Sequence, residues 1–199
     1  MTETTPHHAH TRKGKIRKEM ARQLAELSAA GDLDVATVRA SDYFGPRGTA
    51  LSPLGDMVIG AALLGKPARV LGDPDQPHSY SYTVDIARTL VATGIRPDIA
   101  GEVFHAPNAP ALTTRQTIGV VADQLGTTIK VKTTPPVVLR LLGLRNPTMR
   151  ELLEMLYEFT QPFIVDSTKA GEMLGLEPTP LDQSLDETIH WFRRNQQTA

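Results

Sequence analysis

Five cationic side chains crowd into seven residues of the stretch HTRKGKIRKEMARQL, positions 10 to 24; they are Arg12, Lys13, Lys15, Arg17 and Lys18. The apolar spacing of this stretch predicts a helix, and a helix N-terminus favours anionic over cationic side chains. Two interpretations stay open. The cluster faces an anion (a dinucleotide, or a substrate phosphate or carboxylate), or it is a solvated surface that Glu19 and Glu26 partly neutralise at helical spacing. We favour the solvated surface for every cation except Lys15.

Three of the six histidines, His7, His8 and His10, lie just before this helix. Histidine titrates near neutrality and can exchange protons with a substrate. The stretch MTETTPHHAH has no apolar periodicity, however, and we expect a flexible lead-in over residues 1–10. No helix pairs a histidine with a carboxylate at metal-ligand spacing, so no metal site is expected.

The overall composition excludes several classes of protein. The 199 residues carry a net charge of −1, which argues against nucleic acid or an anionic membrane as the main partner. The sequence has no cysteine, so a disulfide framework and thiolate chemistry are excluded. No run of about 18 apolar residues and no leader sequence is visible. We expect a cytoplasmic globular protein.

Helices and strands alternate around the cationic stretch. Apolar residues at positions 16, 20, 24 and 27 predict a helix that ends at Gly31. The β-branched run LDVATVRA at 33–40 predicts a buried strand directly after it. Further strands are predicted at 68–73, 80–84, 102–106 and 127–133. This alternation indicates the α/β class.

Local signals mark where the other helices begin. A short apolar helix is expected at 57–64, and Asp85 is expected to N-cap a helix that runs to Thr93. Capping boxes are predicted at Thr113 with Gln116, before a helix that stops at Gly126, and at Ser184 with Glu187 before the last helix. The pair Asn146-Pro147 predicts a helix that runs to about residue 159.

Two stretches near the start resemble the second half of the NAD-dependent epimerase/dehydratases, which are extended short-chain dehydrogenase/reductases. TRKGKIRKE resembles their active-site helix, Tyr-x-x-x-Lys with a Glu four residues later, because Lys15 and Glu19 fall on the Lys and the Glu. VRASDYFGPRG resembles their motif Arg-Pro-x-x-x-Tyr-Gly-Pro-Gly through Arg39, Gly45 and Pro46.

Later stretches extend the resemblance over nearly all of residues 3–195. LGDPDQPHSYSYTVDIARTLV resembles the motif Gly-Asp-x-x-x-x-Arg-x-x-x-Tyr-Val-x-Asp-x-Ala; the matching positions are Gly72, Asp73, Tyr82, Asp85 and Ala87. EVFHAPNAPALTTRQTIGVVADQLG is similar to the Thr-x-x-Glu helix of the family, and DSTKAGEMLGLEPTPLDQSLDETIHWFRRN is similar to its C-terminal region.

The resemblance implies an α/β fold: a partial Rossmann-like, doubly wound sheet without its N-terminal strands, plus a small mixed α/β substrate domain. It assigns residues 11–43 and 73–96 to the dinucleotide-binding remnant, and 44–72 with 97–199 to the substrate-binding domain. The Gly-rich loop that receives the pyrophosphate in this fold has no counterpart in the 199 residues. We therefore expect a truncated form, and an exposed sheet edge through which it forms a homo-oligomer.

The resemblance also assigns site residues. Lys15 would hydrogen-bond the nicotinamide ribose, whereas Thr11 stands in the slot of the acid/base tyrosine and is not competent, because an aliphatic hydroxyl is far less acidic than a phenol. Arg39 and Ala40 would flank the cofactor. Asp42, Tyr43 and His78 would line the substrate pocket, because of their positions in the motifs.

The resemblance implies an oxidoreductase or isomerase: an NAD(P)-dependent epimerase, dehydratase or reductase acting on a small polar, sugar-like or carbonyl substrate. His78 replaces the Arg that grips nucleotide-sugar phosphates in the family, which weakens that substrate class because histidine lacks the bidentate fork of arginine. NAD or NADP is expected for the full-length form. Whether this chain by itself binds one of them or neither is left open by the sequence. Two alternatives remain: a catalytically silent dinucleotide- or ligand-binding relative, and an interaction protein.

Overall fold

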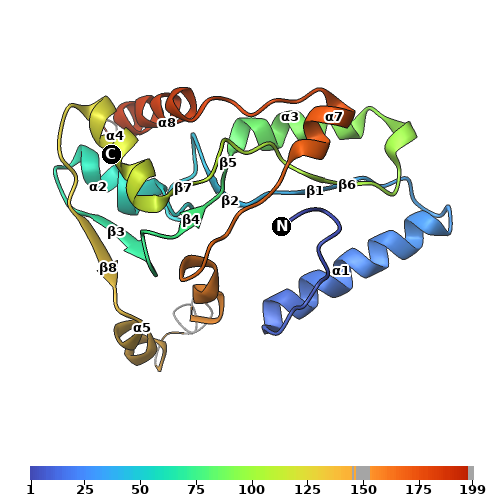
Figure 1. Cartoon of the computed structure of the whole chain (residues 1–199), viewed down its shortest axis with the longest axis horizontal. Coiled ribbons are helices and arrows are strands. Elements are labelled where there is room, and N and C mark those ends of the chain that lie inside the picture. The colour runs from blue at the N-terminus through green and yellow to red at the C-terminus, as the bar shows by residue number, and fades with distance from the viewer. Residues whose placement is uncertain (145, 147–152, 197–199) are drawn as a thin grey trace.

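A computed structural model describes residues 1–144, 146 and 153–196. It is an α/β structure in which the helices are α1 (Arg12–Ala29), the π-helix η1 (Gly55–Gly60), α2 (Ala61–Leu63), α3 (Thr83–Gly94), the 3-10 helix η2 (Pro97–Ile99), α4 (Thr114–Leu125), α5 (Pro136–Gly143), the 3-10 helix η3 (Leu156–Phe159), α7 (Thr168–Leu174) and α8 (Leu181–Gln196). The strands are β1 (Thr37–Arg39), β2 (Asp42–Phe44), β3 (Ala68–Leu71), β4 (Pro77–His78), β5 (Tyr80–Tyr82), β6 (Val103–His105), β7 (Leu112–Thr113) and β8 (Val131–Thr134). Figure 1 shows the arrangement.

The described strands pair two by two. Parallel ladders join β1 to β6, β2 to β5 and β3 to β8, and an antiparallel ladder joins β4 to β7. Thr37 is in register with Val103, and Asp42 with Tyr80. Parallel pairs connected through helices are typical of Rossmann-like sheets. The α/β class and the Rossmann-like sheet are confirmed, while the division into two domains stays a prediction; β6, from the range assigned to the substrate domain, pairs with β1.

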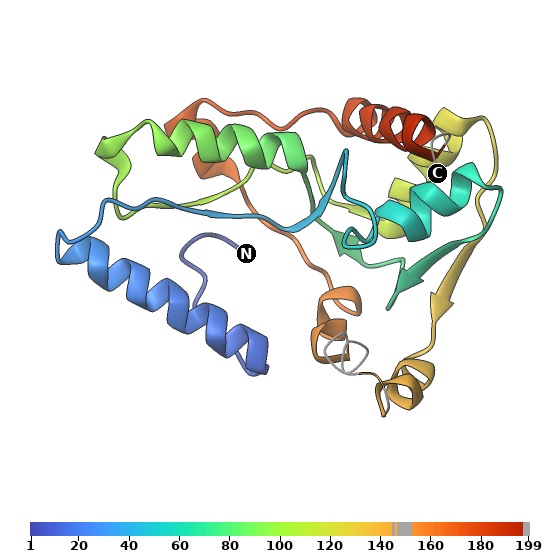
Figure 2. The same ribbon diagram turned by 180° about the vertical axis from the view of Figure 1, so that it is seen from behind.

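Helices α1 and α3 lie on opposite sides of the β1–β6 pair, as both Figure 1 and Figure 2 show. Helix α1 begins at Arg12, and Thr11 is its N-cap, because Thr11 Oγ1 accepts a hydrogen bond from the backbone N–H of Gly14 at 3.1 Å. No residue of α1 is buried, and its apolar side chains Ile16 and Met20 are about half exposed. Among the described strands, β1 pairs with β6 alone, so its other edge is open. The homo-oligomer stays a prediction.

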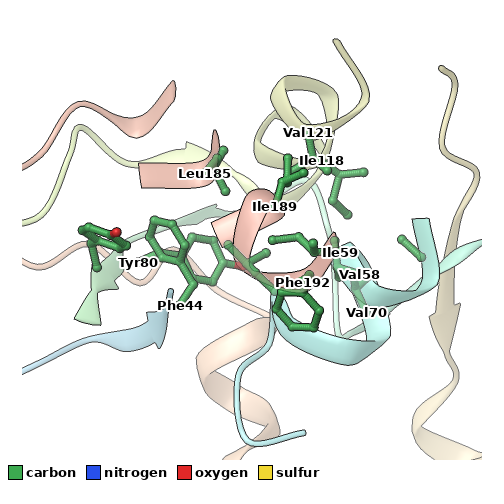
Figure 3. Packing of buried hydrophobic residues seen from close by; sticks show 13 residues of the cluster. Phe44, Val58, Ile59, Val70, Tyr80, Ile118, Val121, Leu185, Ile189 and Phe192 are labelled. Atoms are coloured by element: carbon green, nitrogen blue, oxygen red, sulfur yellow. The ribbon is translucent and has the colours of Figure 1, made fainter. Parts of the chain in front are cut away.

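The main core lies at the other end of the molecule. Figure 3 shows Phe44, Val58, Ile118, Leu185 and Ile189 converging from β2, η1, α4 and α8. All five side chains are nearly inaccessible to solvent. Burying large apolar side chains is worth roughly 1.5–3 kcal/mol each, and this cluster fixes the elements around β2.

Three local predictions are wrong. Asp85 lies inside the first turn of α3 and not at its N-cap, because α3 already begins at Thr83. Ser184 lies inside α8, where its hydroxyl bonds the carbonyl of Leu181. Only Thr37–Arg39 of the predicted strand 33–40 pairs as a strand.

Other boundaries are confirmed. The capping box of Thr113 and Gln116 is formed, and Gly126 ends α4 in the left-handed conformation, with φ of 63°. Pro147 lies outside the described residues, and the residues that follow form helix at 153–155 and then η3. Over the described ranges, no helix combines the length and the apolarity that crossing a membrane requires.

Candidate functional site

The site forms where β1 ends and β2 begins. Residue 41 lies at this step and is buried: the Ser41 N–H donates to Ser81 Oγ at 2.9 Å, and the Ser41 hydroxyl donates to the carbonyl of Ser79. These bonds fix the turn of the chain against β5. Arg39 and Asp42, on either side, are thereby placed at the carboxyl end of β1, the edge at which open α/β sheets bind ligands.

A hydrogen bond between Asp42 and His78 is the centre of the site. His78 Nε2 lies 2.9 Å from Asp42 Oδ2; the histidine is 3 % exposed and the Asp42 side chain 27 %. The imidazole is stacked between Phe159 at 5.4 Å and Phe163 at 5.1 Å, and Tyr80 lies 4.7 Å away. His78 is thus a buried anchor whose polar edge is directed at Asp42, and it is not presented to a phosphate.

The segment that carries the two phenylalanines is bonded tightly to the loop between β3 and β5. The Asp73 N–H donates to the carbonyl of Phe159 at 2.7 Å. Phe163 pairs with β4, donating to Pro77 O at 2.9 Å and accepting from the Ser79 N–H at 2.8 Å. Gly72 makes the close approach possible, because its φ is +65° and an added Cβ would lie 2.2 Å from Phe159 O.

This docking places the Glu158 side chain near Asp42 and His78, and Tyr157 directly precedes it in the chain. Burial and the nearby Asp42 carboxylate raise the pKa of Glu158 above its ordinary value, an effect that His78 partly offsets. Burial and Glu158 likewise raise the pKa of Tyr157. The Tyr157 ring lies 5.1 Å from the ring of His10, which directly precedes α1. The N-terminus of α1 and η3 therefore face the same space, as Figures 1 and 2 show.

The predicted site residues Thr11 and Lys15, at the start of α1, differ in their exposure and in their contacts. Thr11 is buried, and its hydroxyl accepts the hydrogen bond that caps the helix. Lys15 is exposed one turn further on, and no hydrogen bond or ion pair joins its ammonium to another described residue. An ammonium with no carboxylate partner remains available to a ribose hydroxyl.

Arg39 lines a cavity of about 330 Å³ between α1 and the β1–β6 pair. His7, Lys18 and Arg22 contribute further basic groups, and no carboxylate lies among its lining residues. Burial, Arg39 and Lys18 lower the pKa of His7. Arg22 is neutralised on α1 by Glu19 and Glu26, as the helical spacing predicts for this pair of carboxylates. Lys18 donates to the carbonyl of His7 at 3.0 Å and so ties the lead-in to the helix.

The structure therefore brings together part of the predicted set. Asp42 and His78 are in direct contact, Tyr43 is half-buried in β2, and Ala40 is exposed just after β1. The sequence did not indicate Tyr157 and Glu158, because Tyr157 contacts His10 and Glu158 lies near Asp42, each more than a hundred residues away along the chain. The only local signal is the placement of Tyr and Glu in the otherwise apolar stretch LYEF. In the part of the chain that the structure describes, no three His, Asp or Glu side chains converge as metal ligands.

Comparison with known proteins finds distant similarity in sequence and closer similarity in fold. No protein-family model matches the chain. Two distant relatives are 23 % identical: the uncharacterized protein y4nL of Sinorhizobium fredii, aligned over 99 % of this chain and 58 % of its own, and the trifunctional UDP-glucose 4,6-dehydratase/UDP-4-keto-6-deoxy-D-glucose 3,5-epimerase/UDP-4-keto-L-rhamnose-reductase RHM3 of Arabidopsis thaliana, over 82 % and 22 %.

Solved structures agree more closely in fold. UDP-glucose 4-epimerase of Thermotoga maritima with UDP-glucose gives a TM-score of 0.77 at 20 % identity, covering 98 % of this chain and 58 % of the epimerase. dTDP-glucose 4,6-dehydratase of Bacillus anthracis in complex with NAD gives 0.75 at 18 %, covering 99 % and 56 %. The chain spans a little over half the length of these structures. It has the α/β Rossmann-like fold of the NAD-dependent epimerases and dehydratases of the extended short-chain dehydrogenase/reductase family, and the resemblance that its motifs predict is confirmed.

Proposed function

We propose that the protein acts as an NAD(P)-dependent epimerase, dehydratase or reductase on a small polar substrate that is sugar-like or carries a carbonyl. The observation that carries the proposal is the Asp42–His78 pair with Glu158, three titratable groups gathered at the carboxyl edge of β1. Support comes from the fold, because the similar structures are sugar dehydratases and epimerases, several of them in complex with NAD.

The residues of this chain fit one part of such a cofactor. Lys15 has a free ammonium at the start of α1, and Arg39 has a guanidinium at the end of β1, so both can donate to ribose hydroxyls or carboxamide oxygens. A bound nicotinamide would supply hydride transfer at a carbon–oxygen centre. The chain itself would orient that centre and exchange its proton.

The contacts that hold His78 in place restrict the kind of substrate that this position can bind. Its imidazole is enclosed by Phe159, Phe163 and Tyr80 and bonded to Asp42, so this position is withdrawn from phosphate binding. A ligand small enough to lie between α1 and η3 is favoured over one that needs a diphosphate grip at this position.

Binding of NADH and NADPH, followed by the change in cofactor fluorescence, tests the proposal in this chain and in any longer form of the protein. Replacing Lys15 by Met is expected to weaken binding about tenfold, since a hydrogen bond from a charged donor is worth roughly 1.5–3 kcal/mol. Arg17→Met, an exposed cation on the same helix, is the matched control and should leave the affinity unchanged. Absence of binding, or equal losses in both variants, contradicts the proposal.

A further inference from the structure

The cavity between α1 and the β1–β6 pair gathers basic side chains from three parts of the chain. They are His7 of the lead-in, Lys18 and Arg22 of α1 and Arg39 at the end of β1, and none of the described lining residues is a carboxylate. The chain as a whole carries a net charge of −1, so composition does not account for this concentration of one sign. The volume of about 330 Å³ lies in the range of small-molecule sites.

On α1, one of these cations is already neutralised. Glu19 lies 2.6 Å from Arg22, and Glu26 forms a second ion pair with the same guanidinium. Both carboxylates lie outside the lining of the cavity. They compensate Arg22 and leave the other basic groups of the cavity without a counter-charge from α1.

On the strand side, the neighbouring carboxylates are directed elsewhere. Glu102, directly before β6, pairs with Lys169 of α7 at 2.6 Å. Asp34, directly before the lining residue Val35, lines a separate cavity beside α3. Neither carboxylate is among the described residues that line the basic cavity.

Arg39 and Lys18 are therefore the cations with donors to spare. Arg39 is half-buried, and no hydrogen bond or ion pair joins its guanidinium to another described residue. Its backbone is fixed at the strand end, because the Ala106 N–H donates to the carbonyl of Arg39 at 2.8 Å. Lys18 Nζ donates to the carbonyl of His7 at 3.0 Å, and an ammonium has three protons to donate.

The surroundings strengthen the positive potential of the cavity. Arg39 and Lys18, together with burial, lower the pKa of His7. The rest of the lining is largely apolar, and walls of low dielectric constant focus the field of the charged groups into a cleft. The apolar lining residues are Ala21, Leu24, Ala25, Val35 and Val103. An anion in this cavity would relieve the repulsion between the cations.

We propose that this cavity is a binding site for a small oxyanion, a phosphate or carboxylate group, held by Arg39 and Lys18. The parallel N–H groups of a guanidinium match two oxygens of either group, and the ammonium adds a point charge. Thr37 and Ser28, which also line the cavity, can donate hydroxyl hydrogen bonds. The inference goes beyond the proposed function, because the oxyanion is neither its cofactor nor its carbonyl substrate.

Calorimetric titration with inorganic phosphate, and separately with acetate, tests the site in the absence of nicotinamide nucleotides, which would share Arg39. We expect at least one anion to bind, and to bind more weakly as sodium chloride screens the charges. Arg39→Met and Lys18→Met should each weaken binding about tenfold, since hydrogen bonds to charged groups are the stronger ones. Arg17→Met removes an exposed cation of α1 that does not line the cavity, and should leave binding unchanged.

NMR of the imidazole signals gives a second readout, in the unmodified protein. An anion beside Arg39 and Lys18 should raise the pKa of His7, because it offsets the two cations that lower it. The signal lost in His7→Gln identifies this residue, and at constant pH the signal of His190, exposed on α8, should stay in place.

Several results would overturn the inference. They are the absence of binding of both anions, equal responses of His7 and His190, and losses of affinity in Arg17→Met as large as those in the two cavity variants. If Arg39→Met does not fold, Lys18→Met, at an exposed position of α1, decides. Binding of NADH or NADPH is measured separately, so the proposed function and the oxyanion site can fail independently.

Discussion

Replacing Gly72 by Ala tests whether close docking of η3 holds the site together. Gly72 has φ of +65°, and an added Cβ would meet Phe159 O at 2.2 Å and Phe159 C at 2.6 Å. The left-handed conformation costs a non-glycine residue about 1–2 kcal/mol. Displacing η3 additionally removes the Asp73–Phe159 hydrogen bond, worth about 1 kcal/mol, and the stacking of Phe159 on His78, worth about 1 kcal/mol. The free energy of unfolding should fall by about 3–4 kcal/mol.

Gly65 offers an unusually close control. Its φ is also +65°, but nothing lies within 4 Å of an added Cβ. Gly65→Ala should therefore show the conformational cost alone, about 1–2 kcal/mol. Urea unfolding, followed by the fluorescence of the single tryptophan Trp191 and by circular dichroism, measures both variants. Equal losses of stability in the two variants would refute the reasoning, because they would show that the contact with Phe159 contributes nothing.

Three further changes probe other contacts of the fold. Because the pKa of Glu158 is raised, its stabilising contribution is complete below the ordinary pKa of about 4.3 and is lost as pH rises through the pKa in the folded protein. Urea unfolding between pH 4 and 8 should therefore show that Glu158→Gln gains stability relative to the unmodified protein as pH rises. Asp85 is 2 % exposed and accepts bonds from the N–H and hydroxyl of Thr179, both at 2.8 Å, so Asp85→Asn should cost about 1–3 kcal/mol in the same unfolding measurement, and an unchanged midpoint would show that these bonds are dispensable. Ile189→Ala should lower stability by about 2–5 kcal/mol, whereas His190→Ala, its exposed neighbour on α8, should change it little; similar thermal midpoints for the two would contradict the core assignment.

Asp85 shows that a residue near a helix start can be important for the fold although its predicted role as N-cap is wrong. An Asp near a helix start is a good N-cap by sequence, but Thr179, 94 positions away along the chain, donates two hydrogen bonds to the Asp85 carboxylate, and Arg88 donates a third. Ser184 is a second such case, because α8 already begins at Leu181, and Ser184 therefore lies inside the helix and not at its N-cap.

The sequence by itself determined the α/β class, the presence of the helix α1, the capping box before α4 and the order of motifs that predicts the Rossmann-like fold. These features depend on residues within one or two turns of each other, where side-chain and backbone preferences act directly. Sequence also singled out Asp42 and His78 as members of one site, through the resemblance.

Only the tertiary structure decided what those residues do. It turned His78 inward onto Asp42 and between two phenylalanines, and left Lys15 exposed with an unpartnered ammonium. It also brought Tyr157 from η3 to His10, a contact between rings 147 positions apart in the numbering. Such placements depend on how whole elements pack, which is a sum of many weak contacts over the chain and has no local signature in the sequence.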